Sequence, residues 1–285
     1  MTAGDGAAAG FGQRVAAAVA ASGPLCVGID PSAKLLGDWG LPDDATGLRS
    51  FGRRCIEALS GVVPVLKPQV AFFERHGAAG FAALEELLRE ARTAGFMTIA
   101  DAKRADIGST SDAYAEAWLD GASPLAADAV TAVPYLGLGS LHPLITKAQQ
   151  SGRGVLVVVQ SSNPEGRPIQ EAVTEGGRSV ADRLVVEIAE MNRSTAEQSS
   201  SVGAVIGATV GRPAATLSQL GGVILAPGVG AQGATASDVA AMFEGCPRGT
   251  VLPSVSRSVL GAGPDARSLR RVATLAREEM AAALM

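Results

Sequence analysis

The sequence has few cysteines and few histidines, and their positions argue against several kinds of site. Cys26, Cys55 and Cys246 are odd in number, far apart and outside any C-x-x-C spacing. This pattern indicates reduced thiols in a cytoplasmic protein rather than a disulfide framework or a zinc site. His76 and His142 are the only histidines, and neither has a partner at ligand spacing. We therefore expect neither a metal site nor a Ser-His-Asp triad.

Charge is also sparse. Only 18% of the 285 residues are charged, the formal net charge is −4, and Lys and Arg form no run. The chain thus lacks the basic surface expected of a protein that binds nucleic acid or an anionic membrane. No stretch reaches the ~18 apolar residues that a membrane span requires. The N-terminal "GQRVAAAVAASGP" (12–24) lacks the basic leader of a signal peptide, and we interpret it as a surface helix.

Apolar residues are abundant, at 47% of the chain, and they are concentrated in short runs rich in β-branched residues. Each run is followed by Gly, Pro or polar residues, which is typical of a strand and the turn after it. The runs are nearly continuous rather than alternating, as in parallel strands buried on both faces. Eight such strands are predicted, at 25–30, 62–67, 96–101, 128–133, 154–160, 203–209, 221–227 and 250–256.

Segments between the predicted strands have helical spacing. In 80–93 and 179–192, for example, apolar residues recur every three or four positions. Eight β-α units in about 250 residues predict a TIM (β/α)8 barrel. We expect a single domain over 1–285, with 1–23 as a helical extension. A doubly wound sheet is the alternative fold, and the polar 194–201 is interpreted as a loop within the domain.

Enzymes with the barrel fold carry their chemistry at the carboxyl ends of the strands. Polar residues fall at these positions in five of the predicted strands or directly after them. They are Asp30, Lys67, Asp101, Lys103, Ser161, Ser162 and Arg257. Asp101 and Lys103 stand two apart, so in an extended chain their side chains point to one side. Taken singly, D-x-K-x-x-D also fits a salt-bridge patch that caps the next helix, and Lys67 fits a surface lysine.

A glycine-rich loop follows the seventh predicted strand. "GVGAQG" (228–233) spells G-x-G-x-x-G, but it does not follow the first strand and lacks the acidic residue of a dinucleotide site. Barrels commonly bind phosphate after strands seven and eight. The loop that begins at Gly228, together with Arg257, therefore predicts a phosphate site. Segments 161–170 and 230–237 are candidate lids.

The ordered motifs resemble those of the orotidine 5′-phosphate decarboxylases, in their longer bacterial branch. These motifs are "GIDPS", "LKPQ", "DAKRADIGST", "QSSNP", "APGVGAQG" and "SR", and they cover nearly the whole chain. The resemblance implies a network of catalytic charges and a homodimer in which three residues reach the partner's site. The implied network is Lys67, Asp101, Lys103 and Asp106, and the residues that reach the partner are Asp106, Ile107 and Thr110.

The resemblance also implies substrate contacts and a reaction without a cofactor. Asp30 would contact the ribose and Ser162 the pyrimidine, and the phosphate side would include Pro227, Gly228, Gln232 and Arg257. In this chemistry, loss of CO₂ leaves an electron pair in the plane of the ring, and Lys103 is the candidate that stabilises and protonates it.

Two alternatives stay open. One is a magnesium-dependent 3-keto-gulonate-phosphate decarboxylase or hexulose-phosphate synthase, in which an acidic ligand would stand in place of Lys67. The other is a non-catalytic nucleotide-binding barrel.

Overall fold

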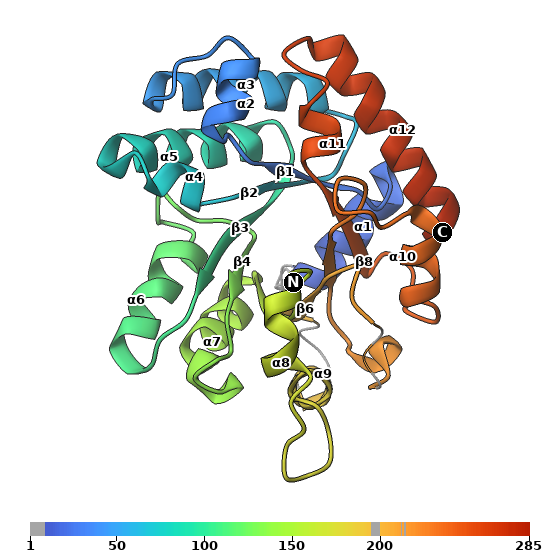
Figure 1. Ribbon diagram of the computed structural model, residues 1–285. Helices are drawn as coiled ribbons and strands as arrows, with labels where there is room; N and C mark the ends of the chain where they lie inside the picture. Colours follow the sequence, from blue (N-terminus) through green and yellow to red (C-terminus); the bar gives the residue numbers. More distant parts are fainter. Residues whose placement is uncertain (1–8, 195–199, 212, 214) are drawn as a thin grey trace, which may run out of the picture.

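The computed structural model describes residues 9–194, 200–211, 213 and 215–285. Eight parallel strands pair in chain order, and β1 pairs with β8 to close a barrel (Figure 1). The predicted barrel is confirmed, and the doubly wound alternative is wrong. All eight predicted runs overlap strands. They are β1 (Cys26–Ile29), β2 (Val65–Pro68), β3 (Met97–Arg104), β4 (Ala129–Ala132), β5 (Gly154–Gln160), β6 (Val202–Ile206), β7 (Ile224–Pro227) and β8 (Val251–Val255).

Helices surround the barrel, and the two helical patterns noted in the sequence correspond to α5 and α9. The α-helices are α1 (Phe11–Ser22), α2 (Ala33–Asp38), α3 (Ala45–Leu59), α4 (Ala71–Glu74), α5 (Gly77–Thr93), α6 (Gly108–Leu119), α7 (His142–Ser151), α8 (Arg167–Gln170), α9 (Val180–Ser194), α10 (Ala236–Met242), α11 (Arg257–Leu260) and α12 (Ala266–Leu284). Three 3₁₀ turns are η1 (Leu138–Leu141), η2 (Pro164–Gly166) and η3 (Leu217–Gln219). No helix in the described part of the chain is long and apolar enough to cross a membrane.

One of the eight β-α units departs from the pattern. Between β6 and β7 the described residues form the 3₁₀ turn η3 rather than an α-helix. This connection contains Gly207, Gly211 and Pro213 and ends on Gly221 and Gly222, residue types that disfavour a helix interior. Of the predicted polar loop 194–201, residues 195–199 lie outside the described residues.

The nearly continuous apolar strands bury both of their faces. One core cluster fills the space between the barrel and the outer helices, and it includes Leu66, Val130 and Val157. A second cluster fills the barrel interior, with Leu156 and Leu252 among its members. Burial on two sides is the reason why the strands lack a polar face.

Helix α1 plugs the amino-terminal end of the barrel. Phe11, Val15 and Val19 recur every four residues, are at most 1% exposed, and belong to the interior cluster. The helix is therefore predicted correctly, but its interpretation as a surface helix is wrong. Alanines on its other positions conceal the fact that the three larger residues form one continuous buried face.

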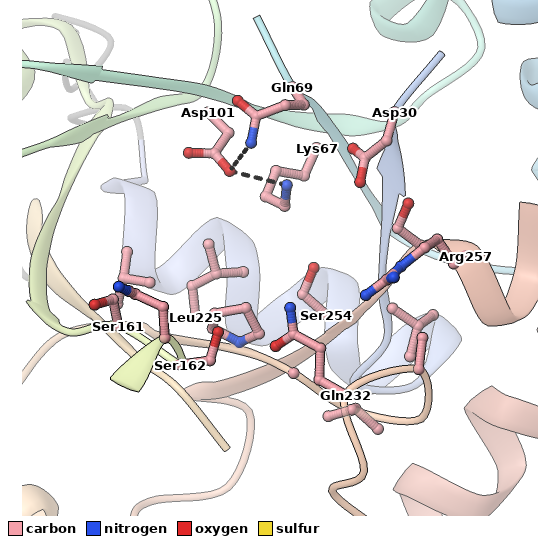
Figure 2. Close-up of a pocket in the computed structure, with 18 of the residues that line it drawn as sticks. Asp30, Lys67, Gln69, Asp101, Ser161, Ser162, Leu225, Gln232, Ser254 and Arg257 are labelled. Atoms are coloured by element: carbon pink, nitrogen blue, oxygen red, sulfur yellow. Dashed lines mark hydrogen bonds and ion pairs between the residues drawn. The ribbon is translucent and has the colours of Figure 1, made fainter. Parts of the chain in front are cut away.

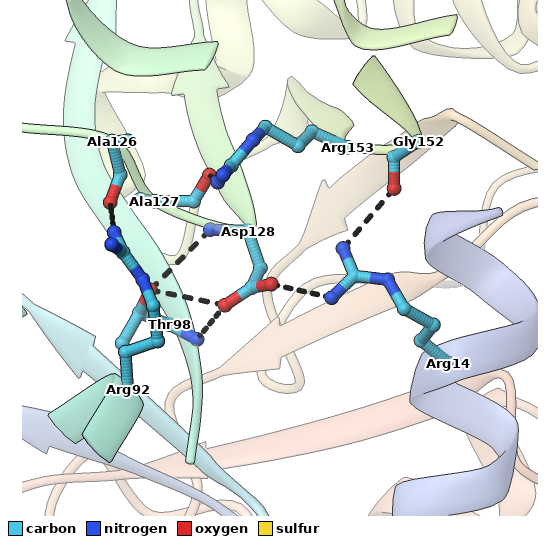
Figure 3. Close-up of polar contacts among 8 residues, drawn as sticks. All are labelled: Arg14, Arg92, Thr98, Ala126, Ala127, Asp128, Gly152 and Arg153. Atoms are coloured by element: carbon cyan, nitrogen blue, oxygen red, sulfur yellow. Dashed lines mark hydrogen bonds and ion pairs between the residues drawn. The ribbon is translucent and has the colours of Figure 1, made fainter. Parts of the chain in front are cut away.

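A polar network ties α1 to the strands above it (Figure 3). Arg14 Nη1 lies 2.5 Å from Asp128 Oδ1, and Arg14 Nη2 donates to the carbonyl oxygen of Gly152 at 3.1 Å. The other carboxylate oxygen of Asp128 accepts from the backbone N–H of Thr98 at 2.8 Å. One end of the barrel is thus closed, while the carboxyl ends of the strands hold a cavity.

Candidate active site

A cavity of about 330 Å³ opens among the carboxyl ends of the strands (Figure 2). Its lining combines apolar side chains from inside the barrel with charged and polar groups from the strand ends. Ten of the residues named from the sequence line it, namely Asp30, Lys67, Asp101, Lys103, Ser161, Ser162, Pro227, Gly228, Gln232 and Arg257. Residues from six of the strand ends or the loops after them therefore converge on one space.

Asp101 is the centre of the polar contacts. Its Oδ2 accepts from Lys67 Nζ and from Gln69 Nε2, each at 3.0 Å. Its Oδ1 accepts from Lys103 Nζ at 2.6 Å and from Thr131 Oγ1 at 2.9 Å. Both carboxylate oxygens are occupied, so the side chain is held in one orientation.

Burial and charge act in opposite directions on this cluster. The side chains of Lys67 and Asp101 are 8% and 9% exposed. Burial alone would raise the pKa of Asp101, but Lys67 and Lys103 hold it well below the usual range of a carboxyl group. Burial would likewise lower the pKa of Lys67, but the carboxylates of Asp101 and Asp30 outweigh it and raise that pKa. The ionised forms of both residues are favoured.

Lys103 stands at a distorted end of β3. Its φ is +47°, in the left-handed region that residues other than glycine seldom adopt. The pairing between β3 and β4 shifts register between Ala100 and Arg104. The N–H of Lys103 donates to Thr131 Oγ1 at 2.9 Å, which holds this conformation in place. With its side chain 49% exposed, Lys103 reaches from the buried cluster into the cavity.

Asp106, the last residue of D-x-K-x-x-D, lies outside the cavity lining, as do the nearby Ile107 and Thr110. Ile107 is 62% exposed, Thr110 is exposed at the start of α6, and Asp106 Oδ1 accepts from the N–H of Ile107 at 2.8 Å. In the part of the chain that the structure describes, none of these three residues lines the cavity. Lys103 and Asp106, three positions apart in sequence, therefore face different surroundings within one chain.

Asp30, at the end of β1, has an oxygen without a partner. Its Oδ1 is buried and accepts no hydrogen bond from the described residues. A Cβ on Gly28 would lie 3.2 Å from this atom and 3.0 Å from Ser256 Cβ, so the backbone passes close behind the carboxylate. A buried acceptor of this kind gains a partner if a ligand supplies a hydroxyl group.

The glycine-rich loop turns back on itself beside β8. The N–H of Gly230 donates to the carbonyl of Ala234 at 2.9 Å, and the N–H of Gly233 donates to that of Gly230 at 2.8 Å. Gly228 has a φ of +102°, and a Cβ there would lie 3.0 Å from Gln232 Oε1. Figure 2 shows Gln232 and Arg257 on one side of the cavity and Ser161 and Ser162 on the other.

Sequence reasoning missed several polar residues of the site. Gln69 follows Lys67 closely in "LKPQ", so this motif could have predicted Gln69 as a site residue. Thr131 sits inside an apolar strand run, where a lone threonine gives no functional signal. Ser254 is a buried polar residue on β8 that lines the cavity.

Beneath the cavity, burial raises the pKa of the Cys26 thiol to about 12, although the nearby Lys67 opposes this shift.

The fold and the cavity define an enzyme-type (β/α)8 barrel, with buried charges at one end of the cavity and a glycine-rich loop with an arginine at the other. The family model for the orotidine 5′-phosphate decarboxylase / HUMPS family matches residues 23–272. The chain belongs to this family.

Relatives of known name extend the comparison. An orotidine 5′-phosphate decarboxylase of Salinispora arenicola is 50% identical over 274 residues, covering 96% of this chain and 98% of the relative. One from Streptomyces coelicolor is 49% identical over 263 residues, covering 92% and 94%. A crystal structure from Streptomyces avermitilis, provisionally named as the same enzyme, superimposes with a TM-score of 0.92 at 49% identity, covering 100% of this chain and 99% of that one.

Proposed function

We propose that this protein decarboxylates orotidine 5′-phosphate to uridine 5′-phosphate and CO₂ in pyrimidine biosynthesis. The observation that carries the proposal is the alternating array in which Asp101 bridges Lys67 and Lys103 at the mouth of the barrel. Relatives that bear the name of this enzyme, at about half identity over nearly their whole length, support it.

The reaction breaks the bond between C6 of the ring and the carboxylate, and CO₂ leaves without the electron pair. The pair stays at C6 in the plane of the ring, where no adjacent π system takes it up. The ammonium group of Lys103 stabilises this charge as it develops and then donates a proton to C6. Lys103 regains a proton from water. No metal or organic cofactor is needed in this scheme.

Asp101 has two roles in the scheme. It fixes Lys103 through the 2.6 Å contact, and as a carboxylate it faces the departing carboxylate of the substrate. Two like charges ~4 Å apart repel by about 4 kcal/mol at an effective dielectric constant of 20. Enzymes lower barriers by about 8–23 kcal/mol, so repulsion alone is too small. Stabilisation by Lys103 and binding of the remote groups supply the remainder.

The remote groups bind along the rest of the cavity. Arg257 and the loop from Pro227 to Gln232 hold the phosphate, Asp30 accepts from the ribose hydroxyls, and Ser162 contacts the pyrimidine. The guanidinium group of Arg257, beside a tightly turned glycine-rich loop, suits an anion. The orphaned Asp30 Oδ1 and the placement of Arg257 across the cavity from Ser162 support this orientation.

The active form in this proposal is a homodimer in the cytoplasm. Asp106, Ile107 and Thr110 of one subunit complete the site of the other. Tyr135 and Leu136, 77% and 53% exposed, lie in the loop after β4, and the 62% exposed Ile107 lies in the loop after β3, the strand that pairs with β4. Exposed apolar residues of this size favour association with a second copy. Thiols such as the buried Cys26, outside any disulfide, fit a reducing compartment.

The magnesium-dependent alternative requires a cation where Lys67 lies. The ammonium group of Lys67 is 3.0 Å from Asp101 and would repel Mg²⁺ at that spot.

The proposed function is tested by the decay of orotidine 5′-phosphate absorbance with purified protein in excess EDTA. We expect turnover that added Mg²⁺ does not increase. Turnover of 3-keto-gulonate phosphate with Mg²⁺, but none of orotidine 5′-phosphate, would establish the alternative, and nucleotide binding without turnover would establish a binding protein.

A further inference from the structure

The side chain of Gln170 ties the segment 161–170 to the end of β5 through two hydrogen bonds to one residue. The backbone N–H of Ser161 donates to Gln170 Oε1 at 3.1 Å, and Gln170 Nε2 donates to Ser161 Oγ at 2.8 Å. The orientation of the amide follows from this pairing, because the N–H of Ser161 must face an acceptor. The NH₂ group of Gln170 therefore faces the hydroxyl of Ser161, which accepts.

The contact is tightly packed and lies behind the cavity wall. A Cβ on Gly166 would lie 2.7 Å from Ser161 Oγ and 2.8 Å from Gln170 Nε2, so the turn η2 covers the pair with no room for a side chain. Ser161 lines the candidate active site, whereas Gln170 lines a neighbouring apolar cavity beside β5. Any effect of Gln170 on a bound substrate must therefore pass through Ser161.

The hydrogen atom of the Ser161 hydroxyl has no acceptor in the described part of the chain. A serine hydroxyl carries one hydrogen and two lone pairs. Because Gln170 presents an NH₂ group to the oxygen, the hydrogen is directed toward a third group. Ser161 borders the cavity, and Figure 2 places it across from Arg257, away from the phosphate end.

We infer that Gln170 is a positioning residue that makes Ser161 a hydrogen-bond donor to a carbonyl oxygen of the substrate's pyrimidine ring, in addition to the neighbouring Ser162. This inference rests on the proposed function. A hydroxyl held as a donor recognises a ring with a carbonyl acceptor and leaves a ring with an amino group at that position unpaired. The pair Ser161 and Gln170 thereby contributes to the selection of the base.

The variant Gln170→Glu tests the inference because a carboxylate only accepts. The introduced carboxylate accepts hydrogen bonds from both the N–H and the hydroxyl group of Ser161. Segment 161–170 therefore stays attached to the end of β5, while the hydroxyl hydrogen of Ser161 points away from the cavity. We expect the KM for orotidine 5′-phosphate to rise about tenfold, with kcat nearly unchanged, because the lost bond is present in ground and transition states alike. Gln150→Glu, on an exposed position of α7, makes the same charge change and should leave KM unaltered.

The variant Ser161→Ala separates the hydroxyl from the added charge. It should raise KM about as much as Gln170→Glu, and the double variant should show no further rise. A KM increase by Gln170→Glu that persists in the Ser161→Ala background, or an unchanged KM in Ser161→Ala alone, would overturn the inference. Competitive inhibition by inorganic phosphate should be equal in all variants, and its weakening in step with KM would also overturn it. Failure of the proposed function is seen separately, as absence of turnover by the wild-type protein.

Discussion

Lys67 Nζ lies 3.0 Å from Asp101 Oδ2, and both side chains are less than one-tenth exposed. A pair of this kind consists of two charges that have lost most of their hydration and depend on each other. Neither residue can be removed alone without leaving the other charge poorly compensated. The pair therefore couples the stability of the barrel to the chemistry at its mouth.

We predict that Lys67→Met lowers the free energy of unfolding by about 3 kcal/mol, because Asp101 keeps a buried charge with one partner fewer. The double variant Lys67→Met/Asp101→Leu should recover most of this loss, since no charge remains to be compensated, while activity stays absent. Urea unfolding of the three proteins measures both effects. A single variant as stable as the double variant would show that the pair is not coupled in this way.

The pKa shifts predict how this contribution depends on pH. The pKa of Asp101 lies below its ordinary value of 3.8, so its share of stability is complete above about pH 5 and is lost as pH falls through the acid range. The pKa of Lys67 lies above its ordinary 10.5, so its share is complete below about pH 9 and is lost as pH rises further. The stability of wild type relative to the double variant should thus be flat across neutral pH. A steep slope between about pH 6 and 8 would contradict these shifts.

Thr131 is predicted to matter for turnover rather than for binding. Thr131→Val keeps the shape of the side chain but removes the hydroxyl that contacts Asp101 Oδ1 and the N–H of Lys103. We expect kcat to fall about tenfold with a small change in KM, as Lys103 loses its fixed position. Thr98→Val is the matched control, because its hydroxyl contacts Asp128 at the opposite end of the barrel. Equal losses of kcat in both variants would indicate a general structural effect.

The homodimer proposal is tested by mixing two inactive chains. Each dimer that combines an Asp106→Ala chain with a Lys103→Ala chain holds one site with both residues intact. Random assembly should therefore restore roughly a quarter of wild-type activity after the chains are unfolded and refolded together. Each variant refolded alone controls for residual activity, and absence of recovery in the mixture would argue against shared sites.

The fold could be predicted from sequence because its strands are simple. A parallel barrel buries both faces of each strand, so the runs that became β1 to β8 are apolar throughout and easy to recognise. The convergence of Lys67 and Asp101 could also be anticipated, since adjacent parallel strands end at the same edge. The role of α1 could not, because its alanines conceal the buried face formed by Phe11, Val15 and Val19.

Other features of the site depend on contacts between residues that are distant in sequence. Thr131 and Asp101 are thirty positions apart, and their hydrogen bond depends on the register of β3 and β4. Gln170 contacts Ser161 only because the turn η2 folds back over Gly166. Neither contact is indicated by the periodicity or the composition of the sequence. Both could be identified only from the three-dimensional structure.

The most direct test of the whole account compares turnover of orotidine 5′-phosphate by Lys103→Ala and Lys147→Ala. Lys147 also pairs with an aspartate, Asp120, at 2.6 Å, but it lies on α7 outside the cavity. In excess EDTA we predict that Lys103→Ala lowers kcat by about 10³-fold or more, whereas Lys147→Ala stays close to wild type. A Lys103→Ala protein that keeps a substantial fraction of wild-type kcat would contradict the assignment of Lys103 as the group that stabilises and protonates C6.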